Sequence, residues 1–181
     1  MKAYSIDPVT QKVEAIDIEM KANTTYSFFN SILIDEFEAI DQHTVSSDSN
    51  ALGNGEKAYF IGEQLVIGKA LIIGRNGMEE HDAHIPQNEL ELIVNFEVPG
   101  FYQQVLALLR TAEINLYRTF VLEHNNEEIR INSEWVIYAF NMADEKTKAY
   151  FLDELQKVVD AKEDVNAYIQ KMAKLALNAT A

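Results

Sequence analysis

The chain's densest group of chemically versatile side chains is the stretch Glu79–His84, which reads EEHDAH. Two imidazoles and three carboxylates within six residues can ligate a transition metal, or can pair to move a proton. The candidate metal ligands are His81, Asp82 and His84. His-x-x-His spacing brings both rings to one side only in a helix, whereas a glycine and a proline flank this stretch. We therefore expect a solvated turn, and a small metal-dependent or acid/base enzyme is the alternative.

Other catalytic and cofactor motifs fail on their spacing. Five residues separate Gly62 from Gly68 where a phosphate loop needs four, and Ala70 stands where that loop needs Ser or Thr. A loop beginning at Asp48 resembles a calcium-binding loop, but Leu52 replaces the required Asp or Asn at its fifth position. The chain has no cysteine, which excludes thiolate metal sites and a cysteine nucleophile. We therefore expect no cofactor, assign no catalytic residue, and favour a protein that is not an enzyme.

Charge is distributed unevenly along the chain. Residues 1–98 hold 6 Lys/Arg against 17 Asp/Glu, a formal charge of −11, whereas residues 99–181 hold 9 against 12, or −3. Direct nucleic-acid binding needs a cationic face, so we expect none. An acidic surface instead suits a basic protein partner. The candidate partner-binding residues form two runs: Asp35, Glu36, Glu38 and Asp41, then Glu79, Glu80 and Asp82.

These features favour a non-enzymatic interaction or regulatory protein that binds a basic protein. Carboxylates arrayed along strands and loops can also imitate phosphates. A narrower form of the hypothesis is therefore a DNA mimic encoded by a phage or another mobile element. The competing explanation is that the same carboxylates only keep the protein in solution.

The expected cellular compartment of the protein is indicated by features of its sequence that are just as simple. The first ten residues are too polar for a signal peptide, and a chain without cysteine has no disulfide staples. No apolar run approaches the roughly 18–20 residues that cross a membrane. We therefore expect a cytoplasmic protein without a membrane partner.

Hydrophobic periodicity predicts a mostly antiparallel sheet of four to six strands, with one or two short helices, over residues 1–98. The expected strands are 2–6, 12–20, 36–45, 58–61 and 65–73, with a helix over 24–34 and a polar loop over 46–56. The stretch 86–98 is compatible with either a helix or a strand. The fold class expected from this pattern is α+β.

A helical part follows over residues 99–181, which begin with Pro99-Gly100. The two modules, 1–98 and 99–181, can form separate cores or share one. The pattern predicts a helix after Tyr102, one capped by Ser133, one over 144–160 capped by Asp144, and one over 163–177. Residues 114–122 fit either a helix or a strand. Most aromatic residues are expected in the core, and the apolar terminal helix makes a homodimer plausible.

Overall fold

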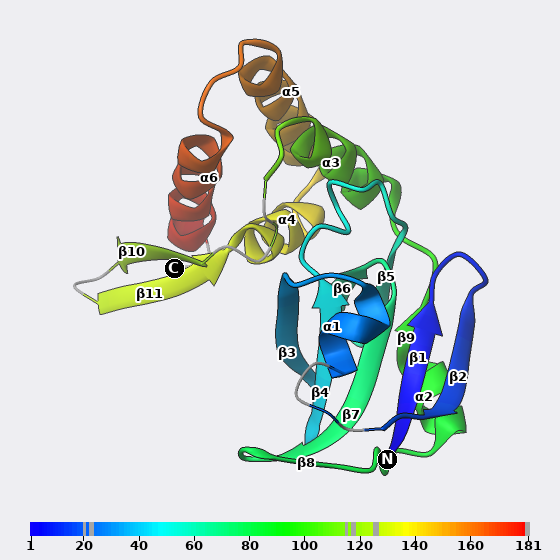
Figure 1. Cartoon of the computed structure of the whole chain (residues 1–181). Coiled ribbons are helices and arrows are strands. Elements are labelled where there is room, and N and C mark those ends of the chain that lie inside the picture. The colour runs from blue at the N-terminus through cyan, green and yellow to red at the C-terminus, as the bar shows by residue number, and fades with distance from the viewer. Residues whose placement is uncertain (20, 22–23, 115, 117–118, 125–126, 180–181) are drawn as a thin grey trace. The chain divides into compact units, whose positions relative to one another are not determined.

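The computed structural model describes residues 1–19, 21, 24–114, 116, 119–124 and 127–179. It shows a mixed α+β protein with antiparallel sheets in its N-terminal part and mainly helices in its C-terminal part, which confirms the expected fold class (Figure 1). Two compact units, Met1–Val98 and Pro99–Ala181, divide the chain. In the described part of the chain, no helix is long and apolar enough to cross a membrane.

The main sheet of the first unit is built around one central strand, β7. Its strands are β1 (Lys2–Asp7), β2 (Lys12–Asp17), β3 (Ile34–Ile40), β4 (His43–Asp48), β7 (Ala70–Asn76) and β8 (Glu79–His81). The order is β2-β1-β7-β4-β3, and β8 pairs with the end of β7. All of these pairs are antiparallel. The first five residues of β7 are buried, because apolar side chains cover both faces of this strand.

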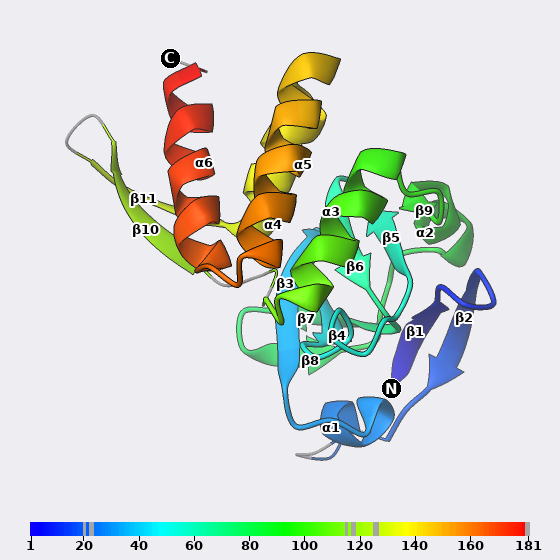
Figure 2. The same cartoon turned by 90° about the horizontal axis from the view of Figure 1, so that it is seen from above.

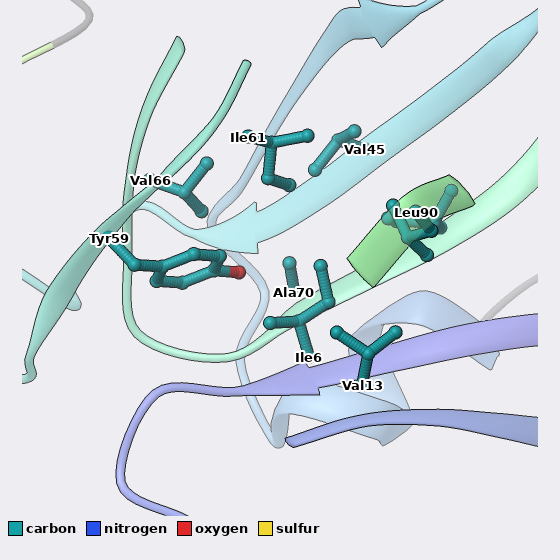
Figure 3. Close-up of a cluster of buried hydrophobic side chains, with 9 residues drawn as sticks. Ile6, Val13, Val45, Tyr59, Ile61, Val66, Ala70 and Leu90 are labelled. Carbon is teal, nitrogen blue, oxygen red and sulfur yellow. The ribbon is translucent and has the colours of Figure 1, made fainter. Parts of the chain in front are cut away.

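The smaller sheet and two short helices complete the first unit. They are β5 (Ala58–Ile61), β6 (Gln64–Ile67), β9 (Val94–Asn95), α1 (Thr24–Phe29) and α2 (Gln87–Ile93). The small sheet has the order β6-β5-β9. Tyr59, Ile61 and Val66 from this sheet, with Leu90 from α2, pack against Ile72 and its neighbours in the main sheet (Figure 3). The other face of the main sheet packs against the phenylalanines of α1.

Several expected element boundaries are wrong, and the reasons are local. The expected strand 65–73 is two strands in different sheets, because Gly68 has φ +76° and turns the chain between β6 and β7. The expected strand 36–45 is also divided, by a turn in which Gln42 has φ 57°. The helix expected to reach residue 34 ends at Phe29, before Asn30 with φ 51°. These left-handed positions end regular structure.

Other expectations need smaller changes. The polar loop begins later than residue 46, because β4 continues to Asp48 and buries Ser46 and Ser47. The stretch 86–98 holds both a helix and a strand, α2 followed directly by β9. Residue 20, at the end of the expected strand 12–20, lies outside the described residues, and β2 ends at Asp17.

In its described residues, the second unit contains four helices and a β-hairpin. They are α3 (Gly100–Thr111), β10 (Thr119–His124), β11 (Glu127–Asn132), α4 (Ser133–Asn141), α5 (Glu145–Asp160) and α6 (Val165–Ala179). Figure 2 shows α5 and α6 side by side, and α4 packs against both. Of the ambiguous stretch 114–122, residues from Thr119 onward form a strand, and residues 115, 117 and 118 lie outside the described residues.

Side-chain hydrogen bonds cap the N-termini of α4 and α5, whereas Pro99 at the start of α3 makes none. The Asp144 carboxylate accepts the backbone N–H of Thr147 at 2.8 Å and begins α5, as predicted. The cap of α4 is Asn132, which accepts the backbone N–H of Trp135 at 2.9 Å, rather than the predicted Ser133. Each cap satisfies a backbone donor that the first helical turn leaves free.

Replacing Gly68 with alanine should destabilise the first unit more than the same change at Gly62. Both glycines have positive φ, so each substitution adds left-handed strain of about 1–2 kcal/mol. A Cβ at Gly68 would also meet the Glu56 carboxylate and the Ala51 methyl, whereas nothing lies within 4 Å at Gly62. Urea unfolding should show Gly68→Ala to be about 1 kcal/mol or more less stable than Gly62→Ala. Equal losses would contradict the close packing at this turn.

Candidate functional site

The two acidic runs chosen from the sequence lie in different parts of the main sheet. The first follows β3, which is an edge strand, and continues into the turn before β4. The second follows β8, where Glu79 pairs with Asn76, Glu80 with Arg75 and His81 with Gly74 (Figure 1). The strands β4 and β7 separate β3 from β8 in the sheet order. Both runs are therefore positioned by β7, one directly and the other through β4.

The β3 run presents an acidic edge with one cation in it. Glu36, Glu38 and Asp41 are exposed. Arg75 forms an ion pair with Glu36, with Nη1 and Oε2 3.2 Å apart, and also donates to the Thr44 hydroxyl at 3.3 Å. A polar hollow of about 450 Å³ lies here, and its lining includes Glu36, Glu38 and Arg75. This arrangement suits a cationic side chain, because one of the two glutamates has no ion-pair partner among the described residues.

Asp35 differs from the other acidic residues of this run because its side chain is partly buried. The residue is half-buried, and its Oδ2 atom is enclosed. Burial raises the pKa of the Asp35 carboxyl, a hydrogen bond with Ser49 lowers it, and the charge of Asp48 raises it. The sequence pattern placed Asp35 with its three neighbours, but its carboxyl group is a poor contact for a partner.

The second run also contains carboxylates in two different situations, and here a hydrogen bond makes the difference. Glu79 and Glu80 are exposed on β8. Asp82 instead accepts the backbone N–H of Lys2 at 2.9 Å, and the next residue, Ala83, donates its N–H to the Lys2 carbonyl at 2.9 Å. These two bonds fasten the segment after β8 to the start of β1. Asp82 is therefore engaged in a structural contact.

The structure adds a residue that sequence reasoning missed, His43. Its side chain is 2% exposed, and its Nδ1 lies 2.7 Å from the Asp41 carbonyl oxygen. A carbonyl only accepts hydrogen bonds, so Nδ1 carries the proton. The unprotonated Nε2 then accepts the backbone N–H groups of His84 at 3.2 Å and Ile85 at 3.3 Å. His43 thereby joins β4 to the segment that follows β8.

Three imidazoles gather around this link. The rings of His43 and His84 are tilted by 33° with centroids 4.3 Å apart, and the ring of His81 lies 5.6 Å from that of His84. Burial lowers the pKa of His43, its hydrogen bond to Asp41 raises it, and charge on His84 or His81 lowers it further. The geometry and the pKa direction agree on a neutral His43.

These contacts leave little to support a metal centre. Both ring nitrogens of His43 are used in hydrogen bonds to the backbone, and Asp82 is engaged by Lys2. Across the described ranges, no group of three or more His, Asp or Glu side chains is placed to hold a metal ion. The metal set His81, Asp82 and His84 remains a sequence-based prediction, and the geometry does not add to it.

No protein-family model, curated protein or solved structure matches this chain. The arguments for its function therefore come from its own surfaces and contacts.

Removing the His43 ring should destabilise the first unit strongly. In His43→Ala the backbone N–H groups of His84 and Ile85 and the Asp41 carbonyl lose their partner, and a cavity remains where the buried ring was, which together cost roughly 2–4 kcal/mol. His84→Ala, in which an exposed ring is lost but its backbone N–H is kept, should cost less than about 1 kcal/mol. Urea unfolding of both variants measures the difference. Similar losses would contradict the assigned role of His43.

Stability should also fall on mild acidification because of His43. Its pKa is lower in the folded than in the unfolded protein, so the unfolded chain binds more protons as pH falls below about 6.5. Unfolding free energy then decreases by up to about 1.4 kcal/mol per pH unit until the folded pKa is reached. In His43→Gln this contribution should vanish, giving a flatter profile between about pH 7 and 5. Parallel profiles for the two proteins would exclude this origin.

Proposed function

We propose that the protein is a non-enzymatic interaction protein that binds a basic protein through the acidic face of its first unit. We use the name acidic face for the exposed carboxylates at two places in the main sheet, Glu36, Glu38 and Asp41 along β3 and its following turn, and Glu79 and Glu80 on β8. The observation that carries the proposal is a local excess of exposed carboxylates. Glu38, Asp41, Glu79 and Glu80 form no ion pair with another described residue, and Arg75 is the one cation paired within the face.

The lysines and arginines of the first unit neutralise little of the negative charge of these carboxylates. Four of its six lysines and arginines are already paired with carboxylates of their own unit. These pairs are Lys12–Glu14, Lys21–Glu19, Lys69–Asp7 and Arg75–Glu36. The unpaired carboxylates of the acidic face would therefore attract a positively charged surface on another protein.

The edge position of β3 adds an argument about the kind of partner. An edge strand leaves backbone groups free on one side, and charged side chains on it discourage pairing with a second copy. Glu36 and Glu38 of one copy would face the same charges of another. A basic chain meets no such repulsion, so the acidic edge favours a basic partner over self-association through β3.

The proposal includes two narrower statements. A chain with no cysteine fits a reducing compartment, and we place the interaction in the cytoplasm. If the partner is itself a DNA-binding protein, the carboxylates of the acidic face stand in for phosphates and the protein acts as a DNA mimic.

Replacing the unpaired carboxylates with neutral amides should weaken binding of the basic partner protein. We would compare wild type with the variant Glu38→Gln, Asp41→Asn, Glu79→Gln and Glu80→Gln by affinity capture from host lysate, with mass spectrometry. One basic protein should bind wild type at about 0.1 M salt and be released near 1 M, because salt screens exposed charges. The variant should bind that protein about tenfold or more weakly, since each exposed pair contributes roughly 0.2–1 kcal/mol.

A matched variant controls for net charge alone. Glu113, Glu127, Glu128 and Glu163 are exposed glutamates of the second unit, and changing all four to glutamine gives the same charge increase. This control should retain the captured protein. Loss of binding in both variants would point to nonspecific attraction, and binding kept by both would contradict the acidic face as the binding surface.

The DNA-mimic form makes a separate prediction. Duplex DNA added to the purified complex should displace this protein from its partner, because both would occupy one cationic surface. The measurement is the loss of complex on a sizing column as DNA is titrated at fixed salt. A ternary complex with DNA would rule out mimicry and leave the broader proposal intact.

A further inference from the structure

Helix α4 in the second unit has two apolar faces, and one of them is not covered by the unit's own core. Its inner face is formed by Val136, Ile137 and Phe140, all buried. The other face carries Trp135, Tyr138, Ala139 and Met142, at the i, i+3, i+4 and i+7 spacing of one helix side. Along this second face Tyr138 is 40% exposed and Met142 is 68% exposed.

This second face is one wall of a groove of about 690 Å³, which we call the α4 groove. The beginning of α5 and the later part of α6 form its other walls. Its lining includes Trp135, Tyr138, Met142, Tyr150, Met172 and Leu175, and the edge of the core residue Phe140 also reaches it. Among the described residues that line it, none is an acid or a base. The groove is therefore mainly apolar along all three helices, with aromatic side chains from α4 and α5.

The groove is not a defect in the core of the unit. Phe140 and Phe151 stack with ring centroids 4.4 Å apart, and Tyr168 packs 5.8 Å from Phe151. The Tyr168 hydroxyl donates to the Phe151 carbonyl at 3.0 Å, which satisfies it inside the core. The three helices are thus held together beneath the groove, and the groove is an additional apolar surface that water covers at a cost in free energy.

Size and charge indicate what this groove accepts. Its volume lies within the range of roughly 300–1,000 Å³ that is typical of small-molecule sites, which occur between helices of bundles. A charged ligand group would lose its hydration without gaining an opposite charge from the lining. Uncharged hydrogen-bonding groups are present, on Trp135, Tyr138, Thr147 and Tyr150. Met142 and Met172 can adapt their shape to a bound molecule.

We propose that the α4 groove binds an uncharged, largely apolar small molecule, such as an acyl chain or ring system with a hydroxyl or carbonyl group. A second copy of the chain is a poorer occupant of the groove. In a two-fold symmetric contact the grooves of the two copies would face each other, and neither would be filled. The proposal concerns the second unit alone and is independent of the acidic face of the first.

Trp135 makes the test direct, because it is the chain's single tryptophan and lies in the groove wall. The probe is N-phenyl-1-naphthylamine, which is uncharged and accepts energy from excited tryptophan. Titration into the full chain should give a saturable transfer signal. Decanol, below its solubility limit, should displace the probe, whereas decanoate and decylammonium should compete at least about tenfold more weakly.

Two variants locate the site. Ala139→Phe fills the groove and should weaken probe binding about tenfold or more, whereas Ala107→Phe, the same change at an exposed position of α3, should leave it unchanged. Leu175→Ser removes part of the apolar wall at a half-exposed position without filling the groove, and should also weaken binding. Circular dichroism confirms that each variant is folded.

Three results would overturn the proposal. One is equal probe binding by wild type, Ala139→Phe and Leu175→Ser. Another is preference for either charged ten-carbon amphiphile over decanol. The last is a dimer in sedimentation that Ala139→Phe dissociates, which would show that a second copy covers the groove.

Discussion

The double burial of β7 is the constraint on which the first unit depends. Alternate residues of this strand enter two different cores, with Ala70 and Ile72 on one side and Leu71 and Ile73 on the other. Both long sides of the strand are also paired, with β4 along one and with β1 and β8 along the other. A shift by one residue would exchange the two cores, so the register is strongly determined. Everything of functional interest in this unit is positioned from this strand.

Glycine at position 74 shows how closely that positioning is specified. A Cβ there would overlap the His81 ring and the Asp82 carbonyl, so the segment after β8 lies directly against the β7 backbone. The Asp82 bond to Lys2 and the His43 bonds to His84 and Ile85 then hold that segment from opposite sides. Asp82, which the sequence offered as a metal ligand, and His43, which it did not single out, therefore both make structural hydrogen bonds.

Sequence reasoning succeeded where the signal is local. The apolar stripe over 144–160 and its Asp144 cap are contained in the segment itself, and α5 follows them closely. It failed at turns inside apparently continuous strands, at Gly68 and at Gln42, and the residue type of Gln42 gives no indication of a left-handed conformation. The acidic runs were visible in composition, but the burial of Asp35 and the role of His43 were not. Those depend on the pairing of β4 with its neighbouring strands and, for His43, on hydrogen bonds to residues 41 and 42 positions later in the chain.

The two units offer surfaces whose physical chemistry differs in kind. The attraction proposed for the acidic face is electrostatic, so added salt would weaken it, and repulsion among the carboxylates of the face disfavours the compact state. The burial of apolar side chains in the two cores around β7 must stabilise the folded unit by more than this repulsion destabilises it. The burial of the strand on both faces serves that requirement. The α4 groove gains its attraction from apolar surface, which salt of the sulfate or phosphate type strengthens. Salt dependence therefore separates the contributions of the two surfaces to any complex that the protein forms.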